Sequence, residues 1–195
     1  MFPLCKGLHI SPGFFLLAAW FALVNGWKTL GLIVAAAALH EGGHALVLHL
    51  LGAEITAFRV GVLGGELTAD RRRLSYGGEL AAVLAGPAAN LLAALLTAGF
   101  GGERWAVFIG ANLVLCVFNL LPLRPLDGGQ AMAMAFSWGL GPEAGERIAR
   151  ILGALSAGAL AAGLGWLMVR TGGSLWLLPM TAAAAGACAK EVFVR

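Results

Sequence analysis

Long runs of apolar residues divide this chain and limit what it can fold into. Hydrophobic residues make up 59% of its 195 residues and charged residues only 12%, a balance far from that of an ordinary soluble domain. A helix that spans a bilayer needs about 20 mostly apolar residues. The runs therefore predict an all-α polytopic membrane protein with about six transmembrane helices, at residues 8–25, 28–51, 79–100, 104–123, 148–169 and 174–192.

Two segments between these runs do not have the composition of a membrane span. Residues 54–68 mix β-branched residues with alternating polarity around Gly64 and Gly65, which predicts a short β-hairpin or re-entrant segment after the second span. Residues 124–147 begin with a predicted Asp-Gly-Gly turn and continue into a surface helix near 131–140. We expect the chain, residues 1–195, to form a single membrane-embedded domain.

Basic residues lie at the ends of the apolar runs and predict the orientation of the chain. With six spans, one side of the membrane carries Lys6, Arg59, Arg71, Arg72, Arg73, Arg124, Arg147, Arg150, Lys190 and Arg195, and the other carries Lys28, Arg104 and Arg170. By the positive-inside rule, the N- and C-termini are expected in the cytoplasm, in a multi-pass protein of the cell membrane. The net charge of +3 is explained by anchoring in the lipid bilayer, and no nucleic-acid partner is expected.

The second apolar run contains the pattern His-Glu-x-x-His at residues 40–44. At about 100° per residue, His40, Glu41 and His44 share one face of a helix, so two imidazoles one turn apart can bind one metal ion. A pair of packed histidines is the alternative. Ionisable side chains within a membrane are costly and usually face a cavity or a partner, so three of them within five residues favour an ion.

Asp127 is the candidate for a third metal ligand. A catalytic zinc site commonly has three protein ligands and keeps a fourth position for water. Asp127 follows the fourth apolar run, where Pro122 and Pro125 end the helix and the glycines at 128 and 129 allow a tight turn. In the predicted topology, this turn and the histidines lie towards the same side of the membrane. The alternative is an ordinary Asp-Gly turn residue.

These motifs resemble those of the site-2 proteases, a family of intramembrane zinc metalloproteases. The family signature is His-Glu-x-x-His on one membrane helix and Asn-x-x-Pro followed by Leu-Asp-Gly on a later one. This chain has both, at 40–44 and 119–128, and Ala-Gly-Pro-Ala-Ala-Asn at 85–90 is similar to a recurrent family element. The resemblance covers roughly residues 30–130, and it looks most like the bacterial group typified by the stage IV sporulation protease FB.

The resemblance implies a role for each matching residue. His40, His44 and Asp127 would bind Zn²⁺, and Glu41 would be the catalytic base that takes a proton from water whose pKa the zinc lowers. Asn119 would lie near the substrate or a developing oxyanion, although a helix-to-helix hydrogen bond is an equal alternative for this amide.

The resemblance also implies what the hairpin and the partners would do. Gly64 and Gly65 would belong to the element that guides the substrate, since an extended substrate can add to a strand edge. The substrates would be membrane-associated proteins, such as a pro-sigma or anti-sigma factor, and inhibitory membrane proteins would be partners as in the sporulation group. We expect neither a PDZ domain nor a nucleotide-sensing domain in this chain.

Two other interpretations remain open from the sequence. A membrane metal transporter or metal-storage protein would use the same histidine face as an ion site, but it predicts further ligands along a path. No line of His, Asp or Glu runs through the third, fifth and sixth predicted spans. The second interpretation is a catalytically inactive family member, but every expected catalytic residue type is present.

Overall fold

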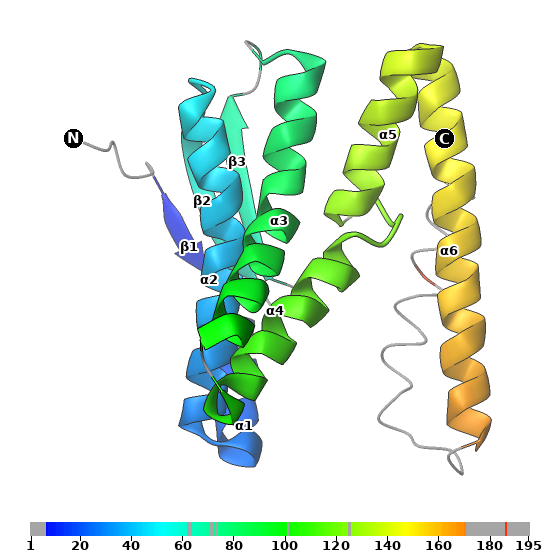
Figure 1. Ribbon diagram of the computed structural model, residues 1–195. Coiled ribbons are helices and arrows are strands. Elements are labelled where there is room, and N and C mark those ends of the chain that lie inside the picture. The colour runs from blue at the N-terminus through cyan, green and yellow to red at the C-terminus, as the bar shows by residue number, and fades with distance from the viewer. Residues whose placement is uncertain are drawn as a thin grey trace. The chain divides into compact units, whose positions relative to one another are not determined.

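The computed structural model describes residues 7–170, apart from 62, 63, 71, 73, 101 and 125, together with residue 186. The chain divides into two compact units, residues 1–119 and 120–195. Figure 1 shows the elements in chain order, and each unit is described by itself below.

The first unit is built on four helices and a short 3₁₀ turn. These are α1 (Pro12–Asn25), α2 (Trp27–Leu50), α3 (Tyr76–Phe100), the turn at Glu103–Trp105, and α4 (Ala106–Asn119). The side chain of Ser11 caps α1 by accepting from the Phe14 amide at 3.3 Å. Gly26, with a φ of 86°, separates α1 from α2, because this conformation favours glycine and interrupts a helix.

Small residues let α2, α3 and α4 pack closely against one another. The buried positions recur about every four residues, which places them on one face of each helix. In α2 they include Ala36, His40 and Leu48; in α3 they include Ala82, Gly86, Asn90 and Ala94; in α4 they are Asn112 and Cys116. The large apolar side chains of these helices are mostly exposed, as expected where lipid covers the surface.

A three-stranded sheet packs against α2 in the same unit (Figure 1). Strands β2 (Glu54–Gly61) and β3 (Gly64–Asp70) form an antiparallel hairpin that pairs Gly61 with Gly64. The short strand β1 (Leu8–Ile10) runs parallel to β2 on its other side. Gly64 has a φ of 127°, which favours glycine at the start of β3.

The second unit contains two described helices, α5 (Asp127–Leu140) and α6 (Pro142–Arg170), which pack against each other. Gly141, with a φ of 85°, ends α5 and allows the chain to reverse. The helices approach closely near this turn, because a Cβ atom on Gly145 would clash with the backbone of Ser137.

The mostly α-helical membrane fold and the hairpin are confirmed. Three described helices, α2, α3 and α6, are long and apolar enough to cross a membrane. The number of spans and the orientation of the termini stay predictions, as does the single-domain organisation. The expected sixth span, 174–192, lies outside the described residues apart from residue 186.

Two predicted spans contain shorter helices than expected, since residues 104–123 hold only the 14-residue α4 and residues 8–25 hold the equally short α1. Residues 8–25 are a strand followed by the 14-residue α1, which at about 1.5 Å per residue is about 21 Å long, shorter than the hydrocarbon core. The first strand forms because β2 offers it a parallel edge.

Residues 127–129 do not form the predicted turn. The turn lies earlier, with the Leu126 amide donating to the Leu123 carbonyl at 2.8 Å, and Asp127 begins α5. The two glycines allow close packing instead, because Cβ atoms on Gly128 and Gly129 would clash with the carbonyls of Leu120 and Leu123.

Candidate metal centre

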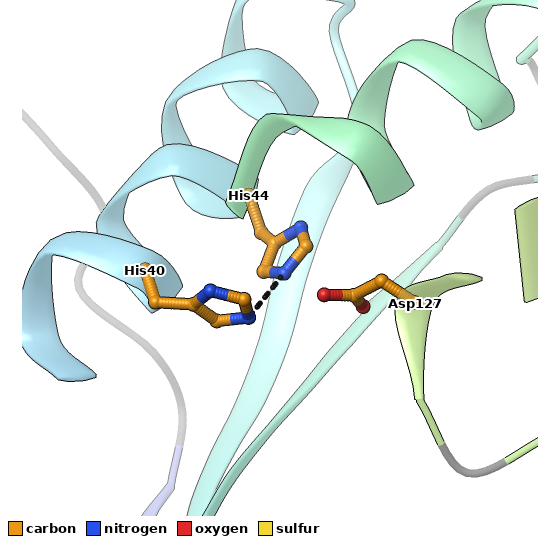
Figure 2. Close-up of side chains that lie close together, drawn as sticks. All are labelled: His40, His44 and Asp127. Atoms are coloured by element: carbon orange, nitrogen blue, oxygen red, sulfur yellow. Dashed lines mark hydrogen bonds between the residues drawn. The ribbon is translucent and has the colours of Figure 1, made fainter. Parts of the chain in front are cut away.

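The two histidines of α2 point their rings at each other. His40 is buried and His44 is half-buried, and their ring centroids are 4.8 Å apart in an edge-to-face arrangement. The two Nε2 atoms lie 3.2 Å apart, the contact drawn as a dashed line in Figure 2. One turn of helix therefore brings one nitrogen of each ring to the same place, as the spacing of the motif predicts.

Helix α3 supplies a hydrogen-bond acceptor for the far side of each ring. The Nδ1 of His44 lies 2.7 Å from the carbonyl oxygen of Ala82, which can only accept, so this nitrogen carries the proton. The Nδ1 of His40 lies 2.6 Å from Oδ1 of Asn90. In the neutral rings both Nε2 atoms then present lone pairs, the form that binds a metal.

The separation of the Nε2 atoms fits a zinc ion. Two lone pairs 3.2 Å apart repel each other unless a positive charge lies between them. For tetrahedral zinc with Zn–N distances of about 2.0–2.1 Å, two nitrogen ligands lie roughly 3.3 Å apart. The distance between His40 and His44 matches that geometry, and the hydrogen-bonded far sides complete the usual environment of metal-binding histidines.

Gly86 makes room for the His44 ring. It lies between Ala82 and Asn90 on the buried face of α3, and a Cβ atom at this position would clash with the imidazole of His44. A second close approach occurs at Gly43, where a Cβ atom would lie 2.8 Å from that of Ala89. The glycines thus let α2 and α3 approach each other closely at the depth of the histidines.

Glu41 lies against the start of β3. A Cβ atom on Gly65 would lie 2.7 Å from both Cδ and Oε1 of Glu41, so the backbone of the hairpin passes next to the carboxyl group. The structure therefore brings Gly65 and Glu41 together, and Gly64 is the neighbouring residue of the same strand. An extended peptide beside this strand would run close to a carboxylate that is able to accept a proton.

Asp127 and Asn119 are the remaining predicted site residues. Asp127 is the first residue of α5, and Figure 2 draws it together with the two histidines. Asn119 is the last residue of α4, and its Nδ2 donates to the Leu115 carbonyl of the same helix at 3.0 Å. This bond lies within α4, so it is neither a helix-to-helix hydrogen bond nor a contact with a substrate. The catalytic role of Asn119 stays a prediction.

Sequence reasoning missed the support that α3 and α4 give to the histidines. Asn90 ends the motif at 85–90 that resembles a family element, but its hydrogen bond to His40 was not predicted. No role was predicted for Asn112. Both residues carry an amide within an apolar run, and that pattern was the available signal. A buried amide needs hydrogen-bond partners, and other buried polar groups such as the histidines can supply them.

These features define a mostly α-helical membrane protein in which one helix holds two histidines ready for a single metal ion. No protein-family model matches the chain. A Synechocystis sp. protein named as a zinc metalloprotease (sll0528) is 30% identical over 168 residues, which cover 80% of this chain and 42% of that protein. Stage IV sporulation protein FB of Bacillus subtilis is 28% identical, over 67% of this chain and 48% of its own length. The chain thus spans about half the length of these curated relatives.

A solved structure has the same fold. The site-2 protease from Methanocaldococcus jannaschii superposes with a TM-score of 0.65 over 100% of this chain and 95% of its own, at 22% sequence identity. These relatives, together with the motifs at 40–44 and 119–128, support the site-2 protease family for this chain.

Proposed function

We propose that this protein is an intramembrane zinc metalloendopeptidase that hydrolyses peptide bonds of membrane-associated proteins. The observation that carries the proposal is the pair of Nε2 atoms 3.2 Å apart, with Glu41 one residue from His40 on the same helix. When bound, zinc lowers the pKa of water towards neutrality and polarises a carbonyl group. Glu41 takes the proton of the attacking water and returns it to the leaving amine.

Asp127 is proposed as the third zinc ligand. A carboxylate oxygen added to two imidazole nitrogens gives the three-ligand set of a catalytic zinc site, with one position left for water. The same set follows from the family resemblance, in which Leu-Asp-Gly supplies the ligand. Asn119, the last residue of α4, is proposed to face the substrate or the oxyanion.

The hairpin is proposed to bind the substrate by strand addition. In the described sheet β2 is the central strand, so β3 offers a free edge, and that strand begins beside Glu41. An extended segment paired with β3 would have its peptide bonds exposed to attack, whereas a helical segment protects them in its own hydrogen bonds. Proline substitutions through residues 64–70 should impair cleavage and leave the zinc content intact; unchanged cleavage would remove this role.

Substrates and partners are proposed from the family resemblance. The substrate would be a pro-sigma or anti-sigma factor tethered to the membrane, with inhibitory membrane proteins as regulators and both termini of the protease in the cytoplasm. Co-expression of the chain with tagged candidate factors tests the substrate, because a shortened product should appear with the wild type and not with Glu41→Gln.

The decisive experiment measures zinc content and cleavage of a membrane-tethered peptide by the detergent-purified chain. Glu41→Gln should keep its zinc and lose cleavage, and Asp127→Ala should weaken both. Glu103→Gln, at an exposed position, is the matched control and should behave as the wild type. Zinc retention without wild-type cleavage of any substrate would instead support a metal-binding or transport role.

A further inference from the structure

A chain of hydrogen bonds connects α4 to the metal-site histidine through α3. Oδ1 of Asn112 accepts from Nδ2 of Asn90 at 2.8 Å, and Oδ1 of Asn90 faces Nδ1 of His40 at 2.6 Å. Both asparagines are 0% exposed. This relay lies entirely within the first unit and is separate from the groups that would touch a substrate.

Two backbone carbonyls fix the direction of the relay. Nδ2 of Asn112 donates to the carbonyl of Phe108 at 2.8 Å, and Nδ2 of Asn90 donates to that of Ala36 at 3.0 Å. A carbonyl oxygen can only accept, so each asparagine has to turn its NH₂ group towards it. The Asn112 oxygen is thereby left for the second N–H of Asn90, and the Asn90 oxygen is left for His40.

We propose that Asn112, acting through Asn90, is a positioning residue that holds His40 in the tautomer with a proton on Nδ1 and a lone pair on Nε2. This inference rests on the proposed zinc site. The competing arrangement is a flipped Asn90 amide, which would present its NH₂ group to Nδ1 of His40. The ring would then carry its proton on Nε2, the nitrogen needed for the metal.

Burial makes the flip most unfavourable when both acceptors of the Asn90 NH₂ group are present. A flipped Asn90 would turn its oxygen towards the carbonyl of Ala36 and the oxygen of Asn112, leaving buried acceptors facing each other. Without the oxygen of Asn112, only the carbonyl of Ala36 opposes the flip. Outer partners of metal-binding histidines commonly change metal affinity by about 10- to 100-fold, so the expected loss on removing the Asn112 oxygen is about 10-fold.

The test measures Zn²⁺ affinity of the full chain in detergent by competition with a chelator of known affinity. Asn112→Leu has a similar size but no acceptor, and it should bind Zn²⁺ about 10-fold more weakly with wild-type helicity by circular dichroism. Asn112→Asp keeps an oxygen towards Asn90 and, as the neutral acid, can still donate to the Phe108 carbonyl, so it should restore most of the affinity. Asn25→Leu is the matched control, since the exposed Asn25 also donates to a carbonyl four residues earlier, that of Phe21 at 3.3 Å.

A second measurement reads the tautomer directly in the wild type and does not depend on whether an Asn112 variant folds. Nitrogen NMR of the zinc-free wild type, at a pH where the ring is neutral, should show His40 with a protonated Nδ1 and an unprotonated Nε2; His40→Ala assigns the signals. A protonated Nε2 in the wild type, or wild-type affinity in Asn112→Leu, would overturn the relay. A wild type that binds no Zn²⁺ would instead overturn the proposed function, while the NMR result would still decide the relay.

Discussion

Replacing Gly86 by alanine should weaken zinc binding at the proposed site. The added Cβ atom would lie 2.6 Å from Cε1 and 2.8 Å from Cδ2 of His44. Carbon atoms pack at about 3.5–4.0 Å, so the ring has to retreat by about 1 Å. Metal–ligand distances are held within about 0.2 Å, and the movement therefore exceeds what the His44 nitrogen tolerates as a ligand.

The expected effects of Gly86→Ala follow from that displacement. Zn²⁺ affinity should fall by at least about 100-fold, the upper end of what losing an outer partner costs, because a ligand itself is displaced. Overpacking should also lower the free energy of unfolding by about 1–3 kcal/mol. A chelator-competition titration measures the affinity, and thermal melting followed by circular dichroism measures the stability.

Gly99→Ala is the matched control for this experiment. Gly99 belongs to the same helix, and a Cβ atom there would meet nothing within 4 Å. This variant should bind zinc as the wild type does and melt at the same temperature or slightly higher, since alanine favours a helix by roughly 0.5–1 kcal/mol over glycine. Wild-type zinc affinity in Gly86→Ala would refute the assignment of the His44 ring to the metal site.

Four further predictions concern close contacts, zinc and Asn119. Gly65→Ala presses on the carboxyl group of Glu41, so cleavage should fall by about 100-fold in kcat with zinc content unchanged, as a misplaced catalytic group implies; wild-type kcat would contradict the contact. Gly43→Ala should lower the free energy of unfolding by about 1–3 kcal/mol in chemical denaturation, whereas Gly42→Ala, with open space around it, should not. Removing zinc with a chelator should lower the melting temperature and added Zn²⁺ should restore it, because a ligand bound to the folded state stabilises that state. Asn119→Ala should leave zinc affinity unchanged and reduce cleavage. Wild-type cleavage in this variant would show that Asn119 only makes the hydrogen bond within α4.

The sequence predicts the parts of the fold that depend on local composition. The helices α2, α3 and α6 follow from apolar runs long enough to span a bilayer, and the hairpin follows from alternating polarity around two glycines. Local composition does not predict β1, because a three-residue strand forms only when another strand offers it an edge. It also misplaces the turn before Asp127, since the glycines there serve packing against carbonyls rather than a change of direction.

The candidate site was predictable to the extent that its chemistry lies in short motifs. His40 and His44 share one helix, so their spacing alone brings their nitrogens together. The bond between His40 and Asn90 joins residues 50 positions apart, and no local pattern specifies such a pairing. The same is true of the contact between Gly65 and Glu41. These contacts depend on how closely the helices and the sheet pack, which is determined by the whole unit.

The parallel pairing of β1 with β2 affects the order in which the sheet folds. Leu8 pairs with Phe58, a partner made about 50 residues later, and both α1 and α2 lie between them. Because contacts between residues distant in sequence form slowly, we expect β1 to pair later than the hairpin, whose two strands are neighbours in the chain. The three-stranded sheet beside Glu41 is therefore complete only after α1, α2 and β2 have been made, and β1 is the strand that completes it.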